Sequence, residues 1–537
     1  MKKIVLLSVA MALSANAEYL PLASPPLSIV ADKGAAVELV PRGEDACDVF
    51  VTSDQPLSEV KLTWTCDFAG ARVLGDHWER AYGDLAWRDV AEDRAMPWYF
   101  LCQAGDRTDG YGVTVQPNAF ASWRTDGKLL TLTLDLRAGG LPVELKGRRL
   151  KAVTLVSRKG RAGENAFAAG ASFCRRMCPT PRLPKEPVYG YNDWYCAYGD
   201  QTHDKFLRDL KPVVALAEGL TNRPFAVIDD GWQKNNPVEF NRVHGHRESG
   251  CGPWDEAGPH FGGTMAQLFA EVAAMGAKPG LWYRPFKAWD GVPDDERLLQ
   301  DRDYFDPSLP QLRARVKADT ARFTAWGAKL IKIDYLAYDL AGVWPFELEK
   351  LDKMIPDGRI WRDRSRTSAE VMKDLYTAMR EGAGDDVVLI GCNAVNHLAA
   401  GLFEGQRTGN DTSGRRWEQT RKYGVNALGM RACQNGTFFQ ADPDCAGLVA
   451  EGAIAWANNA AWIEAVSLSG QSFFLSWRAS LMDDAVRVVL RGAFAAASRP
   501  RPNGEPLDWE ANPFPATWRF AEGTRTFDWT DRTARAE

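Results

Sequence analysis

Two adjacent carboxylates, Asp229 and Asp230, directly follow the apolar run 225–228. Gly231 and Trp232 come next in the chain. Because side chains alternate between the two faces of a strand, adjacent acids at this point fit the end of a buried strand, where the backbone turns away from the sheet. Ionised carboxylates accept hydrogen bonds from hydroxyl groups, and an indole offers an apolar surface on which a sugar ring can stack. The segment therefore indicates a carbohydrate site.

Charged and aromatic residues recur where later apolar runs end. They are Trp282 and Arg284 in one segment, Lys332 and Asp334 in a second, and Arg407 and Asp411 in a third. The segments lie about 50 to 100 residues apart, which is the spacing at which a barrel of parallel strands collects side chains on one rim. These residues are therefore candidates for a single site.

The elements that must position this site begin after an N-terminal β region. Residues 1–17 combine two lysines, an apolar run and a small-residue cleavage motif, which predicts a signal peptide and export to the periplasm or the cell exterior. Alternating apolar and polar residues in 18–175 predict an antiparallel β-sandwich. Prolines in 176–187 predict a linker. The tail, 500–537, predicts a short β extension with a hairpin of 518–520 against 526–529.

Residues 188–499 alternate strand-like and helical segments, which predicts a (β/α)8 TIM barrel. The eight predicted strands are 188–192, 225–228, 278–283, 330–334, 387–392, 402–406, 437–440 and 473–477. Thr264 and Thr367 stand at the expected starts of two helices, and the second begins with a capping box. The chain is thus predicted to be multidomain.

Composition narrows the classes of partner. The 537 residues carry a net charge of −5 and a pI near 5.9, which argues against nucleic acid or an anionic membrane as partner. No run is long enough for a membrane span. Ten cysteines permit disulfides, with Cys174–Cys178 and Cys433–Cys445 as candidate pairs. His244 and His246 share a loop but match no metal-binding pattern, so neither a metal nor a cofactor is predicted.

Several motifs occur in a fixed order within residues 188–445. They are Asp229-Asp230-Gly231-Trp232, Gly252-Pro253-Trp254 followed by Phe261-Gly262-Gly263-Thr264-Met265, Gly280-Leu281-Trp282, Lys332-Ile333-Asp334, and the segment from Arg407 to Asp411. In order and strand position they resemble the retaining α-galactosidases of glycoside hydrolase families 27 and 36, especially the bacterial family 36 enzymes.

The resemblance implies a role for each matching residue. Asp334 would be the nucleophile and Asp411 the general acid/base. Asp229 and Asp230 would hold the axial 4-hydroxyl and the 6-hydroxyl of galactose. Trp194 and Trp232 would line the sugar site, Lys332 would lie near the hydroxyls, and Arg407 would lie close to the acid/base.

The chemistry of retention is consistent with these roles. It needs one ionised carboxylate to attack C1 and one protonated carboxyl to release the leaving oxygen. Lys332 lies two residues before Asp334 on the same strand face, so its charge should keep Asp334 ionised. Asp411 would need a raised pKa. Arg407 works against that requirement, because a close cation lowers a carboxyl pKa.

Two segments depart from the family 36 pattern. The family carries Glu after Trp-x-x-Pro, whereas this chain has Phe286 after Trp282-Tyr283-Arg284-Pro285. Cys392 is followed by Asn393 instead of a glycine-rich turn. Trp282, Arg284, Cys392 and Asn393 complete the predicted substrate-binding set. Of these, Arg284 and Asn393 would alter recognition at the 2-position of the sugar or in the leaving-group site.

These features predict a retaining glycoside hydrolase that releases terminal α-galactosyl residues from oligosaccharides or glycans. α-N-acetylgalactosaminidase and β-L-arabinopyranosidase activities of the same clan remain open alternatives. From a different class, a non-catalytic sugar-binding protein on a decayed barrel remains open as well. The sequence leaves the oligomeric state undecided.

Overall fold

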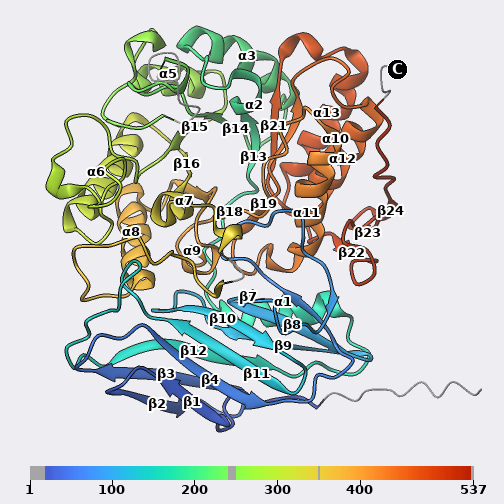
Figure 1. Cartoon of the computed structure of the whole chain (residues 1–537). Coiled ribbons are helices and arrows are strands. Elements are labelled where there is room, and N and C mark those ends of the chain that lie inside the picture. Colours follow the sequence, from blue (N-terminus) through green and yellow to red (C-terminus); the bar gives the residue numbers. More distant parts are fainter. Residues whose placement is uncertain (1–17, 240–249, 349–350, 534–537) are drawn as a thin grey trace, which may run out of the picture.

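The structure of the chain is a computed structural model that describes residues 18–239, 250–348 and 351–533. The predicted signal peptide and the loop that holds His244 and His246 lie outside the described residues. Antiparallel sheets from the N-terminal part form one layer, and a region of parallel strands and helices lies against it (Figure 1).

Twelve strands build two antiparallel sheets in the N-terminal part. In spatial order, the five-stranded sheet consists of β1 (Ser28–Ala31), β4 (Glu59–Thr65), β11 (Leu129–Asp135), β10 (Phe120–Thr125) and β7 (Met96–Pro97). The seven-stranded sheet consists of β2 (Ala35–Pro41), β3 (Ala46–Ser53), β12 (Leu150–Arg158), β9 (Arg107–Val113), β8 (Tyr99–Ala104), β5 (Arg72–Gly75) and β6 (Arg88–Asp89).

The period-two pattern explains how these sheets pack. In β4, Val60, Leu62 and Trp64 are buried, whereas the residues between them are only half-buried. The apolar side chains of such a strand share one face. Phe100 of β8 and Trp123 of β10 meet across the two sheets with ring centroids 6.0 Å apart. The prediction of antiparallel strands is confirmed, and the buried faces of the two sheets are in contact.

The nine-stranded sheet that follows the two N-terminal sheets is parallel throughout. In spatial order its nine strands are β19 (Gln440–Asp442), β18 (Gly405–Arg407), β17 (Val388–Gly391), β16 (Leu330–Ile333), β15 (Lys278–Tyr283), β14 (Phe225–Ile228), β13 (Tyr189–Asn192), β21 (Phe473–Trp477) and β20 (Cys445–Leu448). β19 and β20 stand at the two ends of this order, yet only Pro443 and Asp444 separate them in the chain. All carboxyl ends of these strands therefore lie at one edge of the sheet.

Two of the predicted strands are misplaced. Residues 402–406 are predicted as a strand, but the chain turns at Gly401, whose φ is 83°, and β18 begins only at Gly405. Residues 437–440 are also predicted as a strand. There the Thr437 hydroxyl donates to the Cys433 carbonyl (2.8 Å), so the chain is still in a turn and β19 begins at Gln440.

Helices flank the parallel strands (Figure 1). They are α2 (Trp194–Ala197), α3 (His203–Leu216), α5 (Met265–Ala274), α6 (Pro310–Trp326), α7 (Leu336–Ala341), α8 (Ser368–Ala383), α9 (Asn396–Ala399), α10 (Trp417–Gln419), α11 (Asn426–Met430), α12 (Trp456–Leu468) and α13 (Asp484–Ala497). Thr264 and Thr367 each complete a capping box, at the starts of α5 and α8. The predicted helix starts are therefore confirmed.

A segment of the N-terminal part crosses to the parallel sheet. Residues 76–82, which follow β5 and which we call the bridging segment, begin with Asp76, whose carboxylate pairs with Arg431 (2.6 Å). The Ala81 amide donates to the Thr408 carbonyl (2.8 Å), directly beyond β18. No pattern in the sequence predicts this crossing. It brings N-terminal residues to the carboxyl edge of the parallel sheet.

The C-terminal residues form a small sheet in place of the predicted hairpin. Its strands are β22 (Glu505–Pro506), β23 (Thr517–Phe520) and β24 (Gly523–Thr526). The partner of β23 is therefore 523–526, not 526–529. The reason is packing, because Phe527 and Trp529 stack on one another with centroids 5.0 Å apart and are buried.

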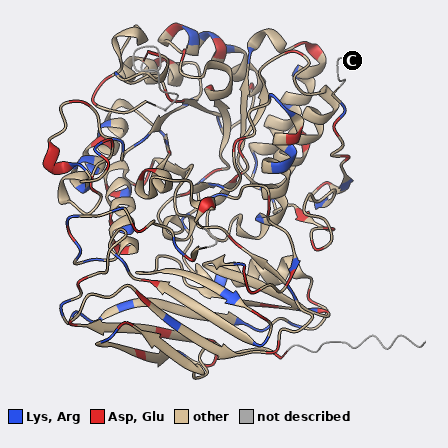
Figure 2. Cartoon of the chain, viewed as in Figure 1, with Lys and Arg blue, Asp and Glu red and all other residues tan. Residues whose placement is uncertain are grey.

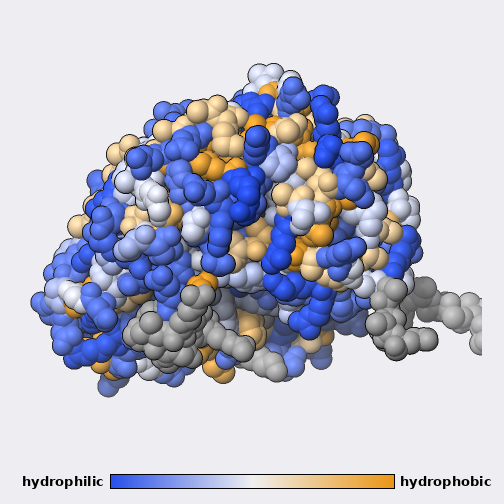
Figure 3. Space-filling view, turned by 90° about the horizontal axis from the view of Figure 1, so that it is seen from above, coloured by the Kyte–Doolittle hydropathy of each residue, from blue (hydrophilic) through white to orange (hydrophobic). Residues whose placement is uncertain are grey.

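All ten cysteines are free thiols, so neither predicted disulfide is present. Cys174 lies in α1 (Ala166–Met177), and its thiol instead contacts that of Cys433 at 4.0 Å. In the described part of the chain, no helix is long and apolar enough to cross a membrane. Acidic and basic residues are interspersed over the sheets and helices (Figure 2), and hydrophilic residues dominate the face seen from above, with apolar groups between them (Figure 3).

Candidate active site

A cavity of about 320 Å³ lies where the parallel strands end. Ten of the twelve candidate residues line it: Trp194, Asp229, Asp230, Trp282, Lys332, Asp334, Cys392, Asn393, Arg407 and Asp411. The sheet explains this convergence. Asp229, Asp334 and Cys392 are each the first residue after a strand, and the strands are parallel, so their side chains leave the same edge.

Lys332 is paired with Asp229. Its ammonium group lies 2.7 Å from Asp229 Oδ2, which also accepts a hydrogen bond from the Asn192 amide at 2.7 Å. The predicted role of Lys332 as the cation that holds Asp334 ionised is therefore incomplete, since its direct ion pair is with a different carboxylate. Asp229 is thus held as an acceptor whose position is fixed by two donors, one from the adjacent strand β13 and one from β16, two strands away on the other side.

Asp230 has a different environment. It is buried, and it accepts hydrogen bonds from the Gln233 side chain (2.6 Å) and the Gly250 amide (3.0 Å). Burial, reinforced by the negative charge of Asp229, raises the pKa of Asp230 to about 7. Asp230 is therefore partly protonated at neutral pH and can both donate and accept hydrogen bonds there.

Asp334 receives one hydrogen bond on each carboxylate oxygen. The Trp282 indole donates to Oδ2 (3.0 Å), and the Tyr335 amide donates to Oδ1 (2.7 Å). Tyr335 adopts a left-handed conformation with φ of 60°, so the chain turns sharply right after the acid. Asn393 Oδ1 accepts from the same amide (3.2 Å). The carboxylate is therefore held in one orientation by Trp282 of β15 and by the backbone turn that follows β16.

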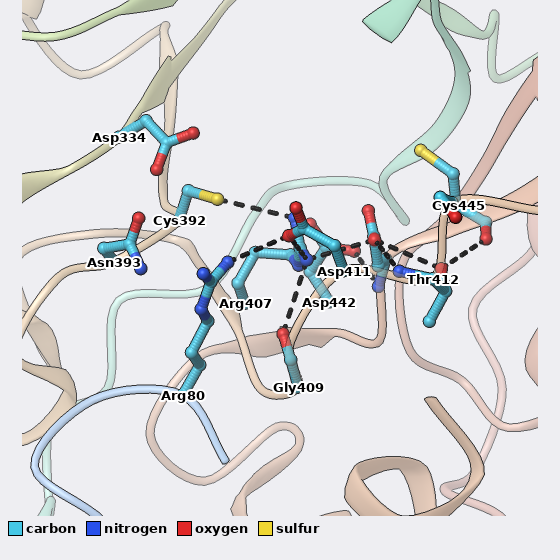
Figure 4. Close-up of polar contacts among 12 residues, drawn as sticks. Arg80, Asp334, Cys392, Asn393, Arg407, Gly409, Asp411, Thr412, Asp442 and Cys445 are labelled. Carbon is cyan, nitrogen blue, oxygen red and sulfur yellow. Dashed lines mark hydrogen bonds and ion pairs between the residues drawn. The ribbon is translucent and has the colours of Figure 1, made fainter. Parts of the chain in front are cut away.

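Asp411 lies between two guanidinium groups (Figure 4). Arg80 Nη1 and Arg407 Nη2 both donate to Oδ1, at 3.0 and 3.1 Å. Arg407 also pairs with Asp444 (3.0 Å). Although the surrounding protein disfavours the charged form, Arg80 and Arg407 hold the pKa of Asp411 below its usual value. The raised pKa that the sequence analysis requires of Asp411 is therefore absent from this arrangement.

Two candidate residues, Trp232 and Arg284, lie behind the cavity and do not line it. Trp232 is fully buried, and its indole donates to the Trp282 carbonyl (3.0 Å). The predicted sugar contact of Trp232 is therefore wrong, because the tight turn that follows Asp230 directs its ring into the core. Arg284 forms a buried ion pair with Asp339 (2.6 Å) and lies 4.0 Å from the Tyr335 ring centroid. It supports the turn after Asp334.

The structure adds cavity residues that sequence reasoning missed: Arg80, Tyr82, Tyr195, Tyr335, Trp344, Phe346 and Asn410. Two come from the bridging segment, where the cluster of charged and aromatic residues at 78–82 was the available signal. Glu79 lies just behind them and accepts a hydrogen bond from Asn393 (3.0 Å). Burial raises the pKa of Glu79 to about 7.

No protein-family model matches the chain. Its structure is similar to that of a Thermus thermophilus α-galactosidase in complex with p-nitrophenyl α-D-galactopyranoside, at 16% sequence identity and a TM-score of 0.59 over 93% of this chain and 96% of that one. The fold is that of the α-galactosidases. A GH36 α-galactosidase from Geobacillus stearothermophilus, solved with raffinose, gives 11% identity and a TM-score of 0.57 over 91% of this chain and 71% of that one.

An α-galactosidase from Lactobacillus brevis adds a third match, at 12% identity and a TM-score of 0.58 over 87% of this chain and 66% of that one. At these identities the similarity concerns the fold. The resemblance to family 36 enzymes, which rests on short motifs in the sequence, is confirmed at that level across most of the chain.

Proposed function

We propose that this chain is a retaining glycoside hydrolase that releases terminal α-galactosyl residues from oligosaccharides or glycans by double displacement. The observation that carries the proposal is the presence of Asp334 and Asp411 on one cavity that also holds the Asp229–Lys332 ion pair. Similarly folded proteins were solved with raffinose and stachyose, which supports the same class of substrate.

In the first step, Asp334 is the nucleophile. One of its oxygens forms a bond to C1 of the galactosyl group while the bond from C1 to the leaving oxygen breaks. The leaving oxygen takes the proton of Asp411. The hydrogen bonds from Trp282 and Tyr335 support this role, because they orient the carboxylate before substrate arrives.

In the second step, Asp411 is the general base. It takes a proton from water, the water oxygen attacks C1, and the bond to Asp334 breaks, so that the anomeric configuration of the substrate is retained. The lowered pKa of Asp411 suits this half of the reaction. The first half needs the protonated form and is therefore expected to favour acidic solution.

The galactose preference is assigned to Asp229 and Asp230. Galactose and glucose differ in the orientation of the 4-hydroxyl, so discrimination needs hydrogen-bonding groups placed for the axial position. Trp194 and Trp282 line the same cavity and offer ring surfaces to the sugar. A site built for a hydroxyl rejects the epimer because its buried polar groups are then left unpaired, at about 1–3 kcal/mol each.

The proposal extends to the domains and to localisation. Residues 18–175 would be a β-sandwich domain, 176–187 a linker, 188–499 a (β/α)8 barrel and 500–537 a β extension. β19 and β20 are the outermost strands of the parallel sheet, where they pair with β18 and β21. The short connection between them supports closure of the sheet into a barrel. Residues 1–17 would be removed on export.

Hydrolysis of a panel of nitrophenyl glycosides tests the proposal. We expect turnover of the α-galactoside with a preference over the α-glucoside on the order of a hundredfold, and nuclear magnetic resonance should show the α-anomer of galactose first. A preference for the α-glucoside would overturn the assignment of Asp229 and Asp230. A preference for the α-N-acetylgalactosaminide or the β-L-arabinopyranoside would move the substrate within the clan. Sugar binding without turnover would identify a binding protein.

A further inference from the structure

The bridging segment is attached to the catalytic region at both of its ends. At its start, Asp76 and Arg431 form an ion pair in which both side chains are at most 2% exposed. Near its end, Ala81 is hydrogen-bonded to the Thr408 carbonyl and forms a parallel bridge with Gly409. This bridge continues β18, the strand that carries Arg407. Arg80 is thus placed by backbone pairing beside the same strand.

The Arg80 guanidinium is buried against aromatic rings and beside Asp411. Its side chain is 6% exposed and lies 5.4 Å from the Trp344 ring centroid and 5.7 Å from that of Tyr82. Its ion pair is with Asp411 (3.0 Å). Arg407 differs, because it divides its donors between Asp411 and Asp444. Arg80 is therefore the cation committed most fully to Asp411.

The two guanidinium groups approach the same oxygen, Oδ1, of Asp411 (Figure 4). Among the described residues, none donates a hydrogen bond to Oδ2, and the Asp411 side chain is 43% exposed at the cavity. An oxygen that accepts from two cations cannot also hold the proton. The proton of the acid form must therefore reside on Oδ2.

We propose that Arg80 is a positioning residue for the general acid/base, which turns Oδ2 of Asp411 toward the glycosidic oxygen and sets the pH above which Asp411 no longer donates a proton. The inference rests on the proposed function. It assigns the N-terminal part a place in the reaction, since Arg80 comes from the bridging segment.

The charged groups around Asp411 give the direction of this effect. Arg80, Arg407 and Lys332 all stabilise its carboxylate and lower its pKa, against the opposing effect of partial desolvation by the surrounding protein. Asp444 and the Tyr195 hydroxyl, which are hydrogen-bonded to one another, also face this corner. Removing the charge of Arg80 should therefore raise the pKa of Asp411 and extend its protonated form to higher pH.

The test compares R80Q, R80K and the control R94Q, whose arginine pairs with Asp84 (3.5 Å) in the same N-terminal part but does not line the cavity. The pH profile of kcat/KM is measured on nitrophenyl α-galactoside. R80Q should move the alkaline limb upward by about one pH unit, so that the protonated fraction on that limb rises roughly tenfold. R80K should keep the limb near that of the wild type, and R94Q should leave it in place.

A second readout does not need activity. The pKa of Asp411 can be followed by nuclear magnetic resonance of protein labelled with carboxyl-¹³C aspartate, and the Asp411 signal is the one that is lost in D411N. In R80Q this pKa should be shifted upward as well. If turnover is present but neither the limb nor the carboxyl titration moves in folded R80Q, the role of Arg80 is wrong. If the carboxyl titration moves but no galactoside is hydrolysed, the pairing stands and the proposed function fails. If R80Q does not fold, R80K decides the question. An alkaline limb of the R80K profile that is displaced from that of the wild type by about one pH unit would overturn the inference.

Discussion

At the scale of single residues, the contacts of Asp334 show how the site would hold the proposed nucleophile. Each of its carboxylate oxygens accepts one hydrogen bond, one from an indole and one from a backbone amide. Neither donor carries a charge, so the carboxylate is oriented while its charge stays available for attack. The nearby cation, Lys332, is occupied by Asp229. An isosteric neutral side chain should therefore preserve the shape of the site and remove its chemistry.

We predict that D334N loses at least roughly a thousandfold in kcat, as expected for removal of a nucleophile, while the protein stays folded. Asparagine has one carbonyl oxygen for two donors, so its amide group must face either Trp282 or Tyr335, at a cost of about 1–3 kcal/mol. Rate measurements on nitrophenyl α-galactoside and urea denaturation check both parts. Turnover at the wild-type rate would remove Asp334 from the mechanism.

Substitution of Asp411 should separate substrates by leaving group. D411A should lose far more rate on a natural galactoside than on one with a very acidic phenol, because the phenol needs little protonation. Azide should rescue the second step and yield α-galactosyl azide. Equal losses on both substrates, with no azide product, would point to another acid. Glu404 and Asp444 are the alternatives, although both are already in buried ion pairs with arginines.

At the scale of elements, the bridging segment carries a buried acid into the site. Glu79 is 1% exposed and is hydrogen-bonded to Asn393 and to the Tyr82 hydroxyl. Burial raises its pKa from 4.5 to about 7. The folded protein therefore keeps this proton over a pH range in which the unfolded chain has lost it. Stability from this group is fully present below pH 4.5 and is lost as the pH rises toward 7.

E79Q should reverse that loss, because glutamine resembles the protonated acid and does not titrate. We predict that the free energy of unfolding of E79Q, relative to wild type, increases by about 2–3 kcal/mol between pH 4.5 and pH 8. Urea denaturation at both pH values measures it. E38Q, at an exposed glutamate of β2, serves as the control and should show no such trend. A difference that is independent of pH would contradict the raised pKa of Glu79.

The elements also show where sequence reasoning succeeds. Asp229 and Asp334 were predictable because each follows a short apolar run that does form a buried strand, β14 and β16, and the end of the run fixes the position of the acid. The predicted strands 402–406 and 437–440 failed because their apolar residues pack in turns, at Gly401 and after Cys433. Apolar content reports burial, and it does not distinguish a buried turn from a buried strand.

At the scale of the whole molecule, the part of the site that could not be predicted is the part that depends on how distant regions dock. Arg80 and Asp411 are 331 positions apart in the chain. No local period or spacing connects them, and the contact exists because the bridging segment extends from the N-terminal sheets to the end of β18. Trp232 was misassigned for a related reason, because the side on which a ring is buried is decided by tertiary packing.

The ion pair between Asp76 and Arg431 holds the two regions in this arrangement. Asp76 accepts hydrogen bonds from the Arg431 Nε (2.8 Å), from Asn396 (3.0 Å) and from Gln434 (3.0 Å), and all of these groups are buried. Removing one partner of such a pair leaves an uncompensated charge in the interior, which costs about 3–5 kcal/mol. The docking of the bridging segment should therefore depend strongly on this carboxylate.

We predict that D76N lowers the free energy of unfolding by about 3–5 kcal/mol, measured by urea denaturation. The double variant D76N/R431M should recover part of this loss, because it removes the unpaired guanidinium. Below the unfolding transition, folded D76N should also lose kcat/KM, since a displaced bridging segment carries Arg80 away from Asp411. A D76N variant within 1 kcal/mol of the wild type, with unchanged kinetics, would mean that the N-terminal sheets are not held to the site by this pair, and that Arg80 depends on the Ala81 backbone bridge alone.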